Sequence, residues 1–222
     1  YEDIRKEVVL QRYVGYRKYE DGRLRRDGKP GFNTSTGRVE LWSYAFDRFG
    51  DQPLPYYEEP QYSPVSTPGL LDEYPFVLTT GARTYAFFHS ENRQVPYCRE
   101  LNPDPLLEIN PADARKAGLA DGQWARVYNQ FGECLLKAKV SPIVKEGVVH
   151  AQHGWWFPEQ DGSEPSLFGV WQSNCNDLVP AHHNNALGLG APYKSACCNV
   201  VPLKESYDVD MAAFDEKFGK LV

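Results

Sequence analysis

The chain has no pair of cysteines at the spacing of a metal site. Its five cysteines are Cys98, Cys134, Cys175, Cys197 and Cys198. Their odd number and scattered positions do not fit a disulfide framework. No Cys-x-x-Cys sequence occurs, so this segment contains neither a zinc ribbon nor an iron–sulfur loop.

Long apolar runs and an excess of positive charge are also missing. No run approaches the roughly 20 apolar residues that a membrane helix needs, so we expect no membrane contact by this segment. The formal net charge is -6, which argues against nucleic-acid binding because that function needs a basic field. An anionic ligand would therefore need a local cluster of cations.

The first residues lack both Met and the apolar core of a signal peptide. We therefore expect a fragment of a longer protein, and the sequence leaves its compartment open. The chain has 222 residues, of which 41% are hydrophobic and 14% aromatic, enough for one substantial core. Dense prolines between residues 53 and 68 favour an extended path. We expect an interdomain arm over residues 1–70, a compact domain over 71–205 and a C-terminal tail over 206–222.

Short strands dominate the expected elements of the compact domain. Expected strands cover 76–80, 106–109, 123–128, 133–140, 148–150 and 198–201. Asn110, Pro111 and Gly118 have the positions of an N-cap, a first helical residue and a C-terminal stop, which predicts a short helix between strands. In 133–140, alternation of apolar and charged residues predicts a half-buried strand. We therefore expect a mainly β domain, a closed barrel with short helices and long loops.

Two expectations concern the ends of the chain. The segment 32–41 predicts a turn that leads into a short strand. Residues 208–219 predict a terminal helix with an apolar set formed by Val209, Ala212, Ala213 and Phe218.

Three polar loops follow apolar segments and are the candidate binding region. They cover residues 80–93, 150–158 and 173–194, and on one barrel they could converge on one ligand. Arginines such as Arg83 and Arg93 can grip a phosphate in a fork geometry. Asp177 can accept two hydrogen bonds from a guanine edge, and Trp155 offers a flat face for stacking. The set fits a nucleotide-bearing ligand better than a bare metal ion.

Simpler structural roles remain open for the same residues. Arg83 alone could be a surface ion-pair residue, Trp155 could be a core aromatic, and asparagines in loops often cap turns. A zinc site is a weaker alternative. Its candidate ligands are His150, His153, His182, His183 and Cys175. It is disfavoured because His150 and His153 face apart in an extended segment.

Motifs in order along the chain resemble a known family. They include Thr80-Gly81-Ala82-Arg83, His89-Ser90-Glu91-Asn92-Arg93-Gln94, Glu108-Ile109-Asn110-Pro111-Ala112-Asp113, Gly154-Trp155-Trp156 and Asn174-Cys175-Asn176-Asp177-Leu178. The ordered set resembles the C-terminal dinucleotide-binding domain of molybdopterin oxidoreductases, the dimethyl sulfoxide reductase family. Thr-Gly-Ala-Arg is most similar to the branch with acetylene hydratase, pyrogallol transhydroxylase and catechol dehydroxylases. The resemblance covers roughly residues 30–202.

The resemblance implies a six-stranded double-psi β-barrel, joined to an extended N-terminal arm. It also implies binding of bis-(molybdopterin guanine dinucleotide), which carries molybdenum or tungsten. Carried over by position, the cofactor-binding residues are Thr80, Gly81, Arg83, His89, Ser90, His153, Trp155, Asn174, Asn176, Asp177, Tyr193 and Lys194.

In such a family the metal ligand and any iron–sulfur cysteines lie in upstream domains. We therefore expect this segment to clamp the dinucleotide, to contain no catalytic or metal-ligating residue, and to lack cofactor and turnover when isolated. Its expected partners are upstream domains of the same chain and, in some members, an iron–sulfur electron-transfer subunit. The alternatives are a small-ligand-binding barrel without enzyme activity and a zinc hydrolase. Substrate, choice of metal, redox direction and oligomeric state are not predicted.

Overall fold

Backbone contacts divide the chain into two compact units. The computed structural model describes residues 2–7, 9, 15–180 and 192–219. The units are Tyr1–Tyr56 and Tyr57–Val222, and each is described by itself.

The first unit consists mostly of turns. Its helices are α1 (Glu2–Glu7) and α2 (Tyr44–Arg48), and the Ser43 side chain caps α2 by accepting the Phe46 N–H. The strand expected near Leu41 is not formed. Instead, the Glu40 carboxylate accepts the backbone N–H and the hydroxyl of Thr36 at 2.8 and 2.9 Å. This local turn replaces the expected strand, because it satisfies the backbone without a partner strand.

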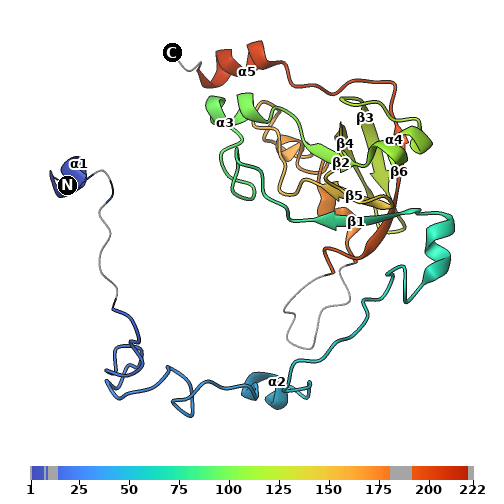
Figure 1. Ribbon diagram of the computed structural model, residues 1–222. Coiled ribbons are helices and arrows are strands. Elements are labelled where there is room, and N and C mark those ends of the chain that lie inside the picture. The colour runs from blue at the N-terminus through green and yellow to red at the C-terminus, as the bar shows by residue number, and fades with distance from the viewer. Residues whose placement is uncertain (1, 8, 10–14, 181–191, 220–222) are drawn as a thin grey trace. The chain divides into compact units, whose positions relative to one another are not determined.

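The second unit is built on a closed six-stranded barrel (Figure 1). Its strands are β1 (Phe76–Thr80), β2 (Leu106–Ile109), β3 (Trp124–Tyr128), β4 (Glu133–Val140), β5 (Val148–Ala151) and β6 (Ala196–Pro202). Around the barrel the order is β1-β5-β2-β4-β3-β6. The pairs β1–β5 and β2–β4 are parallel, and the other four are antiparallel. The predicted six-stranded barrel is confirmed.

The barrel is filled by one side-chain face of each strand. In β4, Cys134, Leu136 and Ala138 are buried while Glu133 and Lys139 are exposed, as the alternation predicted. The largest buried aliphatic side chains of the six strands are Leu78, Leu107, Ile109, Val127, Leu136 and Val149. All five cysteines are free thiols, and only Cys98 is not fully buried.

Helix α4 (Pro111–Ala117) confirms the predicted caps. The Asn110 side chain accepts the Ala112 N–H at 2.9 Å and donates to the Val144 carbonyl at 2.9 Å. Gly118 adopts a left-handed conformation with φ of 66° at the end of the helix. That conformation strains residues with a Cβ, which explains glycine here.

Strand register places the polar loops at one end of the barrel. Thr80 at the end of β1 pairs with Ala151 at the end of β5. Ala151 also pairs with Leu107, near the start of β2. Tyr128 pairs with Glu133 at the β3–β4 turn, and β6 begins opposite Leu78. Strands β1, β3 and β5 therefore end, and β2, β4 and β6 begin, at this loop end. All three polar segments leave the barrel or return to it there.

The remaining helices lie before the first strand, in the connections between strands and after the last strand. They are η1 (Pro68–Asp72), α3 (Pro96–Leu101), η2 (Leu167–Gly169), η3 (Cys175–Leu178) and α5 (Met211–Phe218). Helix α5 lies beside α3 (Figure 1). The predicted terminal helix is formed. Its buried residue is Phe214, which was not in the apolar set named from the sequence, whereas Ala212 and Ala213 are exposed. No helix within the described ranges is long and apolar enough to span a membrane.

Candidate anion-binding site at the loop end

The loop after β1 is fixed at its start by backbone contacts. Both the N–H and the hydroxyl of Thr80 donate to the Tyr193 carbonyl, at 3.0 and 3.3 Å. Gly81, with φ of 91°, then turns the chain in a conformation that a side chain disfavours. The Ala82 N–H donates to His150 Nε2 at 3.2 Å. Thr80 and Tyr193, both predicted as cofactor contacts from different loops, are thus hydrogen-bonded to each other.

His150 is held neutral by its surroundings. Because Nε2 accepts from Ala82, the proton of the neutral ring lies on Nδ1, 3.4 Å from the Glu108 carboxylate. Burial lowers the pKa of His150, and the neighbouring Glu108 opposes this shift. Glu108 also pairs with Lys139 at 3.0 Å. In the strand register, Glu108 faces Lys139 on β4 and His150 on β5.

This arrangement does not support the zinc alternative. His150 already has two partners, Ala82 and Glu108. In the part of the chain that the structure describes, no group of three His, Cys, Asp or Glu residues could hold a metal ion. His182 and His183 lie outside the described residues.

Arg83, His89 and His153 form a directional chain of hydrogen bonds. Arg83 Nη2 lies 3.1 Å from His89 Nε2, and His89 Nδ1 lies 2.9 Å from His153 Nε2. A guanidinium only donates, so His89 Nε2 accepts, His89 Nδ1–H donates, and the His153 proton lies on Nδ1. Burial, followed by nearby cationic side chains and His89, lowers the pKa of His153. The chain therefore delivers a donor, His153 Nδ1–H, to the interior.

Gly154 lets the two loops approach each other closely. A Cβ at Gly154 would come within 3.1 Å of the backbone of His89 and Ser90. The Ser90 carbonyl accepts the indole N–H of Trp156 at 2.7 Å. His89 itself has φ of 48°, which non-glycine residues rarely adopt. The contacts from the 150–158 loop therefore hold His89 in an uncommon conformation.

Arg93 contacts the backbone of the two hydrogen-bonded histidines. It has no carboxylate partner among the contacts of the described residues. It donates to the carbonyls of Glu91, His89 and His153. Its guanidinium lies 3.7 Å from the ring centroid of Phe87 and 4.7 Å from that of Trp155. Burial, with the nearby charge of Arg99, lowers the pKa of Arg93 to about 10. The site therefore contains a buried cation that forms no ion pair within the described residues.

Trp155 belongs to a buried aromatic cluster. Its ring packs against Phe87 and Phe157, and only 2% of its surface is exposed. This position matches the core-aromatic alternative, while its contact with a cofactor stays a prediction.

A small cavity collects donors that have no partner. It has a volume of about 10 Å³, and Arg83, Thr84, His89, Arg93 and His153 are among its lining residues. The buried Thr84 Oγ1, Arg93 Nε and His153 Nδ1 have no hydrogen-bond partner within the described residues. No Asp or Glu lines the cavity. Unpaired buried donors are costly, and a cavity of this size admits one water-sized group. The donor set therefore suits one oxygen of an anionic group that lies outside the cavity beside the exposed Arg83.

A larger cavity adjoins the same loop. Its volume is about 390 Å³. Its lining residues are Ala82, Arg83, Thr84, Tyr85, Ala86, Leu101, Asn102, Leu106, Glu108, Lys139, His150 and Gln152. Arg83 and Thr84 line both cavities, so a ligand with an anionic part and a flat organic part can contact both.

The third polar segment forms a separate cluster. Asn174 caps η3 by accepting the Asn176 N–H at 3.2 Å and donates to the Asp177 carboxylate at 3.0 Å. Burial raises the pKa of Asp177. The backbone oxygen of Asp177 would lie 2.8 Å from a Cβ at Gly132, so this cluster packs on the β3–β4 turn.

The predicted site residues therefore divide into groups at one end of the barrel. Neither cavity beside Arg83 is lined by Asn174, Asn176 or Asp177, and Lys194 is exposed. The sequence reasoning missed Thr84 and Gln152, and it did not predict the Glu108–Lys139–His150 group. Glu108 and His150, each the single polar residue of an otherwise apolar strand, were the available signal for that group.

Comparisons with known proteins identify the family to which this domain belongs. The family model for the Molydopterin dinucleotide binding domain matches residues 76–197. The chain belongs to this family. Its match runs from β1 to the start of β6 and includes every predicted site residue. The domain therefore binds a molybdopterin dinucleotide, as the resemblance predicted.

Relatives of the domain are much longer proteins. Dopamine dehydroxylase of Eggerthella lenta is 35% identical over 175 residues, covering 69% of this chain and 17% of the relative. Acetylene hydratase of Syntrophotalea acetylenica is 38% identical, covering 62% of this chain and 19% of the relative. Dimethyl sulfoxide reductase DmsA of Escherichia coli is 26% identical, with 86% and 24% covered. The chain thus spans about a fifth of these relatives.

A solved structure shows the same fold. Acetylene hydratase from Pelobacter acetylenicus matches with a TM-score of 0.69 and 31% identity, covering 80% of this chain and 25% of that one.

Proposed function

We propose that this domain grips the dinucleotide of a bis-(molybdopterin guanine dinucleotide) cofactor within a longer molybdenum or tungsten oxidoreductase. The observation that carries the proposal is the set of donors at the loop end, with a buried Arg93 and unpaired N–H groups on Arg93 and His153. When bound, the cofactor supplies chemistry at its metal. The residues of this domain bind and orient it, and turnover belongs to the complete protein.

Each side chain has a distinct role in this proposal. Arg83 is exposed and lies at the mouth of both cavities, where its fork can pair with a phosphate. His153, whose Nδ1–H is directed into the interior by its hydrogen bond with His89, stabilises the same negative charge. Thr80 and Tyr193 hold the loop through their backbone hydrogen bond. Gly81 supplies the turn.

Other predicted contacts belong to separate parts of the loop end. Asn174, Asn176 and Asp177 offer amide and carboxylate groups suited to a heteroaromatic edge, so we assign them to another part of the dinucleotide. Ser90 and Lys194 are exposed at the loop end and complete the proposed contacts. The remaining domains of the longer chain are the proposed partners, and an iron–sulfur cluster belongs among them.

Arginine replacement in the full-length enzyme tests the proposal. Arg83→Ala removes the exposed cation at the mouth of the site, so we expect pterin and metal content to fall several-fold. Arg126→Ala is the matched control, because Arg126 lies on β3 and pairs with Glu133. Both variants should keep the circular dichroism spectrum of the wild type. Unchanged pterin and metal content in Arg83→Ala would contradict the proposal.

A further inference from the structure

The segment after β6 is fastened to the outside of the barrel. The Asp208 carboxylate accepts the indole N–H of Trp124 at 2.8 Å and pairs with Lys137 at 2.6 Å. The next residue, Val209, donates its N–H to the Asp104 carboxylate at 3.1 Å. Asp210 then caps α5 by accepting the N–H groups of its first turn. These contacts fix where α5 starts.

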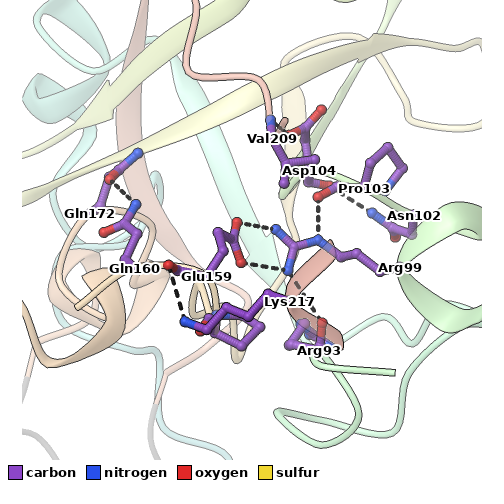
Figure 2. Close-up of polar contacts among 11 residues, drawn as sticks. Arg93, Arg99, Asn102, Pro103, Asp104, Glu159, Gln160, Gln172, Val209 and Lys217 are labelled. Atoms are coloured by element: carbon purple, nitrogen blue, oxygen red, sulfur yellow. Dashed lines mark hydrogen bonds and ion pairs between the residues drawn. The ribbon is translucent and has the colours of Figure 1, made fainter. Parts of the chain in front are cut away.

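Helix α5 holds the loop that follows β5. Lys217 Nζ donates to the carbonyls of Pro158 and Glu159 at 3.0 and 3.3 Å (Figure 2). On the inner face of the helix, Phe214 is fully buried, and its ring centroid lies 5.0 Å from the Arg99 guanidinium. Arg99 in turn makes two hydrogen bonds to the Glu159 carboxylate, at 2.6 and 3.2 Å.

Arg99 connects this cluster to the candidate site. It donates to the Arg93 carbonyl at 3.3 Å (Figure 2). The guanidinium groups of Arg93 and Arg99 lie 4.7 and 5.1 Å from the Trp155 ring. Arg93 binds the carbonyls of His89 and His153. A continuous set of contacts therefore links Lys217 to the hydrogen-bonded chain that ends at Arg83.

We propose that α5 stabilises the conformation of the anion-binding loops and that Lys217 is the positioning residue through which it does so. The loops over residues 81–95 and 152–166 contain no strand, so they depend on such contacts for a fixed conformation. A preorganised site avoids the entropy cost of ordering these loops when the ligand binds. The effect on the cofactor rests on the proposed function, whereas the effect on the loops does not.

Hydrogen exchange of the 222-residue chain tests the structural half of the inference. Lys217 lies at the surface, so Lys217→Met should fold. It loses the two hydrogen bonds to carbonyls and the contact of Nζ with the Phe218 ring. We expect faster amide exchange in residues 81–93 and 152–160, with strands β1 to β6 unchanged. Lys217→Arg retains a donor and should restore slow exchange. Glu216→Gln, an exposed position on the same helix, is the matched control.

Cofactor release from the full-length enzyme tests the functional half. We expect Lys217→Met to release cofactor about tenfold faster, the equivalent of about 1.4 kcal/mol. The inference would be overturned if amide exchange in both loops of Lys217→Met were as slow as in the wild type. It would also be overturned if exchange were faster but the rate of cofactor release were unchanged. Failure of the proposed function gives a different result, namely unchanged cofactor content in Arg83→Ala.

Discussion

Replacing Glu159 by Gln tests whether the buried Arg99 guanidinium depends on its carboxylate. The Arg99 side chain is 0% exposed and that of Glu159 is 21% exposed. Gln has nearly the same size, so the change removes the charge without leaving a cavity. Breaking a buried ion pair by removing one partner costs about 3–5 kcal/mol. Arg99 keeps the carbonyls of Pro103 and Arg93 as acceptors, so we expect a loss of about 2–3 kcal/mol.

Urea unfolding of the 222-residue chain, followed by circular dichroism, measures this loss. The midpoint should fall while the slope stays constant, because the surface exposed on unfolding does not change. Glu100→Gln is the control, since Glu100 is exposed beside Arg99 on α3 and should change stability by less than about 0.5 kcal/mol. A loss below about 1 kcal/mol in Glu159→Gln would refute the reasoning, because the carbonyls alone would then satisfy Arg99.

Two further predictions concern pH and the barrel core. Burial keeps His150 unprotonated in the folded chain, so the unfolded chain binds more protons below the ordinary pKa of 6.5. The free energy of unfolding should therefore be constant just above pH 6.5 and fall as the pH drops below that value. In urea titrations, His150→Gln should weaken this fall. An equal pH dependence in both proteins would argue against the prediction. Leu136→Ala should cost about 3 kcal/mol by the same assay, and Leu135→Ala, on the opposite face of β4, about 1 kcal/mol or less; equal losses would contradict the inward face assigned to Leu136.

The barrel could be predicted because its signals are local. Each strand is short and bounded by turns, and alternation in β4 identified the buried face before any pairing was known. The caps of α4 at Asn110 and Gly118 were equally local. Such signals depend on neighbours along the chain, so they survive folding with little change.

The site was predicted less completely because its contacts join distant segments. Arg83 and His89 were candidates from the sequence, and their hydrogen-bonded link to His153 depends on contact between two loops. Nothing near Arg99 in the sequence indicates its partner Glu159. The buried position of Phe214 likewise depends on the location of α3. Near Leu41, a local turn formed in place of the expected strand. Family resemblance supplied the ligand, which the residues alone described only as nucleotide-bearing.

Strand β6 has a consequence for how the protein is made. It pairs with both β1 and β3, so these two strands keep unpaired edges until residues 196–202 have been synthesised and have left the ribosome. Pairings of such high sequence separation form late and slowly. Under the proposed function, loading of a cofactor at the loop end then follows translation of nearly the whole domain, so a protein that contains cofactor has already formed β6.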